Sequence, residues 1–262
     1  MKPILSARNV EKSFGAFVAA RDISCDIQPR ETVSIIGANG AGKTTFVNMI
    51  SGHLVPSKGT IMFNGCDITG LASRKITQMG LVRSFQIAQV FPTLTVIENM
   101  CSAMAIARCN GNLVELCKQR MLAPDIVQAA EEKLAQFAIA KYRDFPANAL
   151  SQGVKKILDV AMAAAGEPQL ILLDEPTSGV SLEERYGLMK YIIDALKQRG
   201  VTIIFIEHDM EIVAHFADRV LAFIDGTIIA DGSPKEVFAR PDVIERITGG
   251  TSPGKVVQHS HA

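Results

Sequence analysis

The chain has 262 residues, 48% of them hydrophobic, and its 27 Lys and Arg residues balance 27 Asp and Glu residues. This length and hydrophobic content supply a full-sized buried core, so they exclude a globally disordered chain and allow one large α/β domain with or without a smaller subdomain. The zero formal charge disfavours DNA or RNA as a main partner, because nucleic-acid binders usually carry a basic excess.

We expect neither a membrane-spanning helix nor an N-terminal signal peptide in this sequence. No apolar run approaches the roughly 18 residues that a membrane-spanning helix needs. The N-terminus has one Lys and no apolar stretch before Arg8, unlike a signal peptide. We therefore expect the protein to stay in the cytosol and to reach a membrane only through a partner.

The first quarter of the chain predicts a small antiparallel layer, then a strand, a glycine-rich loop and a helix. Two strand-like segments flank a turn at Phe14-Gly15, and a third strand closes at the Asn64-Gly65 turn pair. The predicted strands are residues 4–10, 17–27, 32–36 and 59–63, and the predicted helix is residues 43–50.

A helical insert follows, because the periodicity changes between residue 95 and about residue 150. A second amphipathic helix covers residues 126–139, and the whole subdomain is expected at about residues 87–165. The first helix places five apolar side chains on one face: Val96, Ile97, Met100, Met104 and Ala107.

The remainder alternates strands with helices, which favours a largely parallel sheet covered on both faces. The long helix ends at Gly200, a residue type common just after helix ends. We expect one domain over residues 1–248 and a flexible tail over 249–262. The predicted helices are 153–165 and 182–198, with another short one after residue 206, and the strands are 81–85, 170–173, 201–206, 220–224 and 227–230.

A phosphate cradle is predicted between the strand ending at residue 36 and the next helix. Its pattern is Gly, four residues, Gly-Lys-Thr, in which backbone amides and a helix N-terminus approach phosphate oxygens. Lys43 would reach the β- and γ-phosphates of ATP, and the Thr44 hydroxyl would bind Mg²⁺. A chance glycine-rich turn is the alternative, disfavoured by the correct strand and helix on its flanks. The predicted nucleotide-binding residues are Gly37, Ala38, Asn39, Gly40, Ala41, Gly42, Lys43, Thr44 and Thr45.

Two adjacent acids end a buried strand at Asp174 and Glu175. The carboxyl ends of parallel strands line the ligand crevice, so these acids are expected to face the phosphates. Asp174 is the natural holder of Mg²⁺, and Glu175 is placed to polarise the attacking water. Taken alone, the pair could equally be two solvated acids at a strand end. The predicted phosphate cradle makes that interpretation the weaker one.

Together these motifs resemble those of ATP-binding cassette (ABC) ATPases across about residues 4–248. Residues 150–154, Leu-Ser-Gln-Gly-Val, look like the family's Leu-Ser-Gly-Gly-Gln signature. Gln86 matches its Q-loop glutamine, His208 its switch histidine, and Phe14 its adenine-stacking aromatic residue. Each of these would be unremarkable alone, and their order around the two strong motifs carries the resemblance. The fold implied is a RecA-like P-loop NTPase core with an N-terminal antiparallel β layer and a helical subdomain.

The resemblance also implies a composite site between two subunits. ATP would lie between one P-loop and the partner's signature, where Ser151 and the Gly153 amide would touch the γ-phosphate. Gln86 would join Thr44 and Asp174 around Mg²⁺ and, with His208, arrange the γ-phosphate. Lys43, Gln86, Glu175 and His208 are thus the expected catalytic residues.

Two departures from the family pattern concern this composite site. Gln152 replaces the first signature glycine, and Val154 replaces the signature glutamine. Residues 178–181 end in Ser181, where the family often has aspartate. The strength of this half-site and its coupling to the other site are left open by these changes.

Within the family, residues 80–86, 91–99 and 241–244 are similar to ATPases of branched-chain amino-acid-type importers. This branch implies two permeases, a second and different ATPase subunit, and a periplasmic solute-binding protein. The ATPase would sit peripherally on the cytoplasmic face of the inner membrane.

Other functions remain alternatives. Related uptake systems take urea, amides or aromatic and other carboxylates. A non-transport ABC ATPase is disfavoured because long coiled-coil insertions and a second cassette are absent from the sequence. A small-molecule kinase would not explain the signature or His208, and a pure nucleotide-binding module would not explain Glu175.

Overall fold

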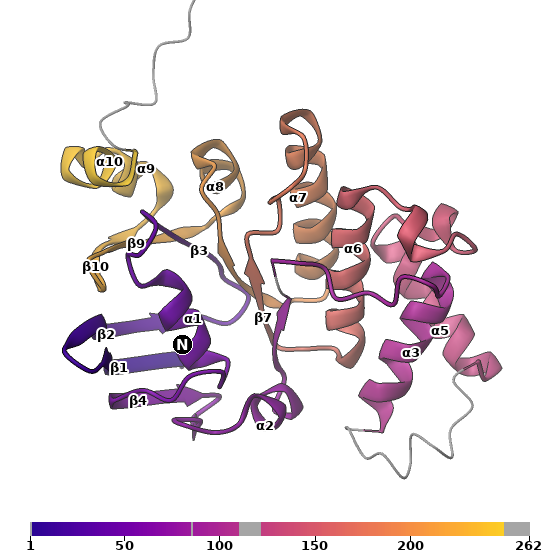
Figure 1. Cartoon of the computed structure of the whole chain (residues 1–262), viewed down its shortest axis with the longest axis horizontal. Coiled ribbons are helices and arrows are strands. Elements are labelled where there is room, and N and C mark those ends of the chain that lie inside the picture. The colour runs from indigo at the N-terminus through magenta and orange to yellow at the C-terminus, as the bar shows by residue number, and fades with distance from the viewer. Residues whose placement is uncertain (1, 85, 110–121, 249–262) are drawn as a thin grey trace, which may run out of the picture.

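The computed structural model describes residues 2–84, 86–109 and 122–248 of the chain (Figure 1). The expected tail, residues 249–262, lies outside this part. No described helix has the length and apolar character needed to cross a membrane.

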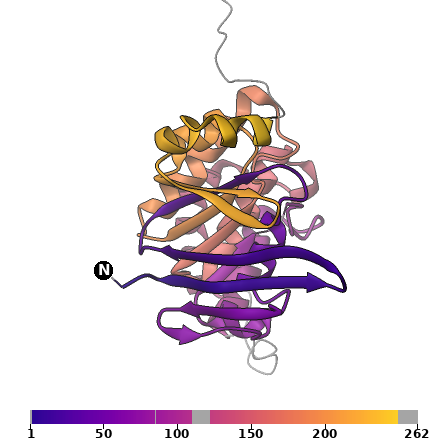
Figure 2. The same ribbon diagram turned by 90° about the vertical axis from the view of Figure 1, so that its left-hand side faces the viewer.

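The N-terminal half of the chain contributes an antiparallel layer. Its strand order is β2-β1-β4-β5, and Figure 2 shows the two long strands of this layer running side by side across that face. Alternation of buried and exposed side chains along these strands is typical of a sheet with one covered face. The strands are β1 (Leu5–Phe14), β2 (Phe17–Ile27), β4 (Lys58–Phe63) and β5 (Cys66–Asp67).

A second, six-stranded sheet forms the core, in the order β10-β9-β3-β8-β7-β6. Five neighbouring strands are parallel, and β10 pairs with β9 antiparallel. The expected ABC ATPase fold, a parallel core with an antiparallel layer and a helical region, is confirmed. The strands are β3 (Thr32–Gly37), β6 (Leu81–Ser84), β7 (Leu170–Asp174), β8 (Thr202–Ile206), β9 (Arg219–Ile224) and β10 (Thr227–Gly232).

Helices cover both faces of the parallel sheet, and α3, α5 and α6 gather at one side of the molecule (Figure 1). The helices of the first half are α1 (Lys43–Ile50), α2 (Ser73–Gln78), α3 (Val96–Arg108) and α5 (Pro124–Gln136). Those of the second half are α6 (Gln152–Ala163), α7 (Leu182–Lys197), α8 (Met210–Phe216), α9 (Pro234–Phe238) and α10 (Pro241–Thr248).

Several boundaries differ from the predictions. The helix expected to reach residue 165 ends at Ala163, and a 3₁₀ turn, Ala164–Gly166, follows it. The first strand continues to Phe14, four residues past its predicted end. The short helices α2, α9 and α10 and strand β5 were not predicted, because segments this short carry too few periodic positions.

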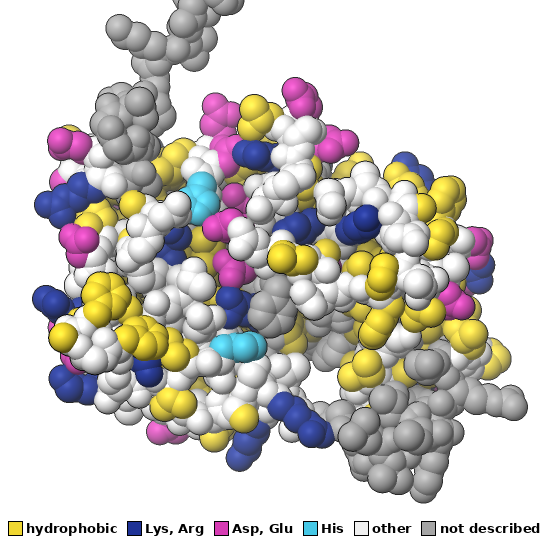
Figure 3. All heavy atoms as spheres, viewed as in Figure 1, with side chains coloured by type: hydrophobic (Ala, Val, Ile, Leu, Met, Phe, Trp, Pro, Cys, Tyr) yellow, Lys and Arg dark blue, Asp and Glu magenta, His cyan; other side chains and the backbone are white. Residues whose placement is uncertain are grey.

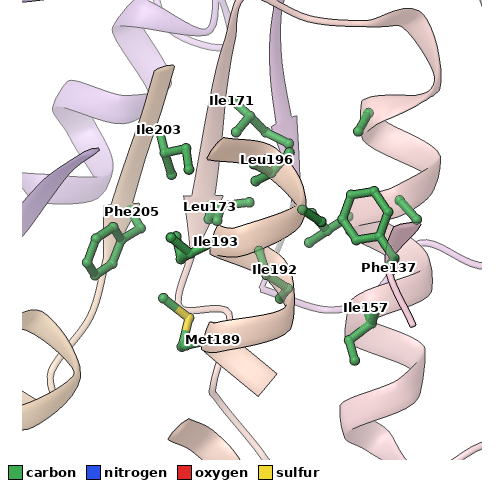
Figure 4. Close-up of a cluster of buried hydrophobic side chains, with 14 of the residues drawn as sticks. Phe137, Ile157, Ile171, Leu173, Met189, Ile192, Ile193, Leu196, Ile203 and Phe205 are labelled. Atoms are coloured by element: carbon green, nitrogen blue, oxygen red, sulfur yellow. The ribbon is translucent and has the colours of Figure 1, made fainter. Parts of the chain in front are cut away.

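Successive side chains along a strand point to opposite faces of the sheet, so the core has one hydrophobic cluster on each face. In β7 and β8, Ile171, Leu173, Ile203 and Phe205 face α7, whereas the alternating residues pack on the side of α1. Figure 4 shows the α7 side chains between this sheet face and helix α6, with Phe137 and Ile157 on the far side. This packing fixes the strand ends, and therefore the loops that follow them.

Candidate active site

The predicted phosphate cradle lies at the carboxyl end of β3 and leads into α1, the position expected from the sequence. A Cβ on Gly37 (φ 153°) would lie 2.4 Å from the Phe223 carbonyl oxygen, and one on Gly42 (φ 96°) would lie 2.7 Å from the Ala19 carbonyl oxygen. Side chains are therefore excluded at both positions. A cavity of about 430 Å³ opens over the loop, lined by Ala38, Asn39, Gly40, Ala41, Ile224, Asp225 and Arg246.

Lys43 is buried beneath this loop. Its ammonium donates to the Gly37 carbonyl oxygen at 2.6 Å and to the Ala38 carbonyl oxygen at 3.0 Å. Burial lowers the pKa of Lys43, while the nearby carboxylates Glu175 and Asp174 act to raise it. The glycine-rich loop with Lys43 and the acid pair Asp174-Glu175 therefore lie close enough to interact electrostatically, as expected.

Glu175 joins two predicted catalytic residues from other strand ends. Its carboxylate accepts a hydrogen bond from Gln86 Nε2 at 2.7 Å, and His208 Nε2 lies 3.0 Å from its other oxygen. A carboxylate only accepts, so His208 donates through Nε2. Glu175 also has a φ of 47°, a conformation rare for a residue with a side chain. The sheet thus brings Gln86, Glu175 and His208 together at the carboxyl ends of β6, β7 and β8.

Asp174 is held by an arginine that the sequence analysis did not select. Arg83 Nη2 donates to Asp174 Oδ2 at 2.6 Å, and its Nη1 donates to Asn48 Oδ1 at the same distance. The guanidinium therefore ties α1 and β6 to β7. A charged residue inside the apolar strand of residues 81–84 was the available signal, because buried arginines are almost always paired.

Glu207 was also missed, although it directly precedes His208. It is 4% exposed and accepts hydrogen bonds from the Thr177 amide at 3.0 Å and from Thr177 Oγ1 at 2.7 Å. Burial raises the pKa of Glu207, and the bonds from Thr177 act against that rise. Glu207 thereby connects the end of β8 to the loop that follows Glu175.

Lys156 is the third residue that sequence reasoning missed. It lies on α6, is 6% exposed, and its Nζ donates to the Gln86 carbonyl and, at 3.5 Å, to the Glu175 carbonyl. Burial lowers the pKa of Lys156, and the surrounding carboxylates, Asp159 foremost, oppose that change. The lysine therefore joins α6 to the two chain segments that carry the predicted catalytic residues Gln86 and Glu175.

The predicted signature residues lie at the start of α6. Ser151 is the N-cap residue and its side chain accepts from the Val154 amide at 3.4 Å. Ser151 and Gln152 are exposed.

Phe14, the predicted adenine-stacking residue, ends β1 with half of its surface exposed, and Lys12 Nζ lies 5.2 Å from its ring centroid. Figure 3 shows hydrophobic side chains gathered at the end of this hairpin.

Thr44, Asp174 and Gln86 offer hydroxyl, carboxylate and amide oxygens. This is the hard-oxygen donor set that suits Mg²⁺. No group of three or more His, Cys, Asp or Glu residues that could hold a metal occurs in the described part. The residues fit a magnesium ion bound jointly with phosphate better than an ion held by protein alone.

A groove of about 570 Å³ separates α2 and β6 from α3 and α6. Phe91 and Ile106 expose nearly half of their surface there. Asp159 on α6 is 6% exposed; its Oδ1 accepts from the Gln89 amide at 2.7 Å, and its Oδ2 has no hydrogen-bond partner among the described residues. The groove is therefore mainly apolar with one carboxylate in its floor.

Comparisons with known proteins agree with the family resemblance of the sequence motifs. The family description "ABC transporter" matches residues 20–178. The chain is 32% identical over 251 residues to the high-affinity branched-chain amino acid transport ATP-binding protein LivG of Escherichia coli, covering 95% of this chain and 98% of LivG. It is 31% identical to the corresponding protein BraF of Pseudomonas aeruginosa, with the same coverage. The ADP conformation of MJ1267, an ATP-binding cassette of an ABC transporter, superposes with a TM-score of 0.82 at 31% identity, covering 96% of this chain and 100% of MJ1267.

Proposed function

The chain belongs to the ABC transporter ATPase family, and we propose that it is the ATP-hydrolysing subunit of an importer for small polar solutes such as branched-chain amino acids. The observation that carries this proposal is the Glu175 carboxylate held between Gln86 and His208, within reach of Lys43. The similarity to LivG and BraF, whose names state branched-chain amino acid transport, supports the choice of solute class.

In the proposed mechanism, Lys43 leaves the loop carbonyls and binds the β- and γ-phosphates. Glu175 accepts the proton of the attacking water, while Gln86 and His208 orient that water and the γ-phosphate. Thr44, Asp174 and Gln86 would hold Mg²⁺, which neutralises phosphate charge when bound. Most of the rate enhancement then comes from positioning and charge neutralisation.

Two such subunits would enclose ATP, each offering its signature to the other's P-loop. The exposure of Ser151 and Gln152 at the start of α6 supports this arrangement. We propose residues 1–248 as one ABC ATPase domain with the helical subdomain at about residues 87–165. One permease would dock in the apolar groove beside Asp159 and the other on the second ATPase subunit, so the subunit would lie on the cytoplasmic face of the inner membrane. A periplasmic solute-binding protein would deliver the solute.

The central test is hydrolysis by Glu175→Gln. This variant keeps the side-chain volume and one acceptor oxygen but lacks the base. We expect near-normal ATP binding, a loss of about 10²–10⁴-fold in turnover, and accumulation of an ATP-bound dimer. Glu132→Gln, which changes an exposed acid on α5, is the control and should retain wild-type turnover. Near-normal turnover by Glu175→Gln would refute the assignment of the base.

The second subunit is proposed to be a different ATPase. A homodimer would carry Gln152 and Val154 in both composite sites, whereas a heterodimer can pair one altered site with one intact site. The purified chain should therefore hydrolyse ATP slowly, and adding the second ATPase with the permeases should raise the rate. A quadratic rise to a brisk rate with concentration of this chain alone would instead establish a competent homodimer.

A further inference from the structure

A separate cavity of about 420 Å³ lies at the amino ends of the core strands. Arg30 precedes β3, Gln169 precedes β7, and Thr202 begins β8, and all three line this cavity. Because the catalytic residues follow the carboxyl ends of these strands, the length of the sheet separates the two places. For the five residues of β8 this length is about 17 Å, at roughly 3.3 Å per residue.

The cavity contains a buried cation that forms no ion pair with any described residue. Lys133 on α5 is 2% exposed, and its Nζ donates to the Ala164 carbonyl oxygen at 3.2 Å. Among the described residues it forms no ion pair, although an ammonium has three N–H donors. Burial lowers the pKa of Lys133 to about 8. A buried charge is costly unless it is paired, so this position favours an anion.

The remaining charges around the cavity also favour an anion. Arg30 and Arg199 line it with Lys133, and Glu167 is the one carboxylate among the lining residues. Arg199 binds Glu167 and donates through Nε to Gln136 Oε1 at 2.7 Å, which holds the guanidinium in place. Three cations therefore face one carboxylate.

The walls between these charges are apolar. They come from the 3₁₀ turn, from α7, and from residues next to the ends of β1, α5, β7 and β8, and so join the helical region to the core. A ligand here needs an apolar group of modest size in addition to its charge. The apolar wall residues are Ile4, Phe137, Ala164, Pro168, Leu196 and Val201.

We infer that this cavity binds a small monocarboxylate with a short branched or unbranched apolar chain. The carboxylate pairs with the Lys133 ammonium, and the apolar chain lies against Phe137 and Leu196. A single negative charge fits the site better than a phosphate dianion, because only one of the three cations is fully buried and the walls are mostly apolar.

The test is calorimetric titration of the full chain, without nucleotide, at pH 7. The probes are 3-methylbutanoate, its neutral analogue 3-methylbutan-1-ol, and inorganic phosphate. We expect 3-methylbutanoate to bind with millimolar or tighter affinity, and the alcohol and phosphate to bind at least tenfold more weakly. Absence of 3-methylbutanoate binding, or equal binding of the alcohol or of phosphate, would overturn the inference.

Variants locate the binding. Lys133→Met keeps the length of the side chain and should weaken 3-methylbutanoate at least tenfold, whereas Lys141→Met, which changes an exposed lysine, should leave it unchanged. If Lys133→Met does not fold, Arg199→Gln replaces it and should weaken binding at least threefold. Unchanged affinity in the folded variant used would overturn the assignment. Because no nucleotide is present, the result is independent of the proposed ATPase function.

Discussion

Lys156 offers a direct test of how the signature helix communicates with the chain's own catalytic site. The start of α6 is expected to meet ATP bound to the partner, and Lys156 lies five residues beyond Ser151 on the same helix. Its ammonium binds the Gln86 carbonyl and the Glu175 carbonyl. A displacement of α6 therefore reaches Gln86 and the proposed base, Glu175, directly through this side chain.

The expected effect of Lys156→Met follows from the lost contacts. A hydrogen bond from a charged group contributes about 1.5–3 kcal/mol, and here it positions Gln86 and Glu175 and leaves the phosphates untouched. We therefore expect kcat to fall roughly 10- to 150-fold, with KM for ATP changing less than about threefold. Lys156→Arg keeps a donor and should restore part of kcat.

The assay is steady-state hydrolysis with the partner subunits present, compared with nucleotide binding at equilibrium. Lys155→Met is the matched control, because Lys155 is the neighbouring residue and donates to the Asn148 carbonyl rather than to Gln86 or Glu175. The reasoning fails if Lys156→Met and Lys155→Met lower kcat equally, or if Lys156→Met lowers ATP affinity as much as kcat.

Three further outcomes are expected. Lys43→Ala should weaken ATP binding by about 1.5–3 kcal/mol in an equilibrium titration, because a charge-assisted phosphate contact is lost. Phe14→Ala should weaken ATP and GTP alike, since every purine offers a ring face; a hundredfold preference of the wild type, about 2.8 kcal/mol, would contradict this. The folded pKa of Lys133, about 8, lies below its ordinary 10.5, so the unfolded chain holds more protons between these values and stability should rise with pH there. Denaturant unfolding at pH 7, 8.5 and 10 should show that rise in the wild type and lose it in Lys133→Met.

The sequence predicted the elements that carry long periodic patterns and the loops at their ends. α1 occupies the predicted residues 43–50, and β7 ends at the predicted acid pair. Glycine spacing and strand ends are local properties, so one segment reveals them. The rule that carboxyl ends of parallel strands share one edge placed the acid pair at the ligand crevice, whereas Gln86 and His208 were assigned from the family resemblance.

The supporting residues could not be assigned in the same way. Arg83, Lys156 and Glu207 act through partners 91, 70 and 30 residues away in the chain, and no local pattern specifies such pairs. Their apolar surroundings do mark them as charges that must be paired. Which partner each one takes depends on the order of β6, β7 and β8, and therefore on the tertiary fold.

Gly153 illustrates the difference between a glycine that the fold requires and a glycine that is needed for function. It is the second residue of α6, and glycine costs up to about 1 kcal/mol relative to alanine in a helix interior. A Cβ there would find its nearest neighbour, Val180 Cγ1, at 3.9 Å, which is ordinary contact. The chain's own packing therefore gives no reason for glycine, and we ascribe it to the approach of the partner's nucleotide.

Gly153→Ala should consequently be as stable as the wild type or up to about 1 kcal/mol more stable, yet lose most hydrolysis in the assembled complex. Gly187→Ala is the matched control, because Gly187 lies inside α7 and an added Cβ there would have no neighbour within 4 Å. It should gain similar stability and keep its turnover. Wild-type hydrolysis by Gly153→Ala would mean that the γ-phosphate does not approach this backbone, and the assignment of residues 150–154 as the signature would lose its physical basis.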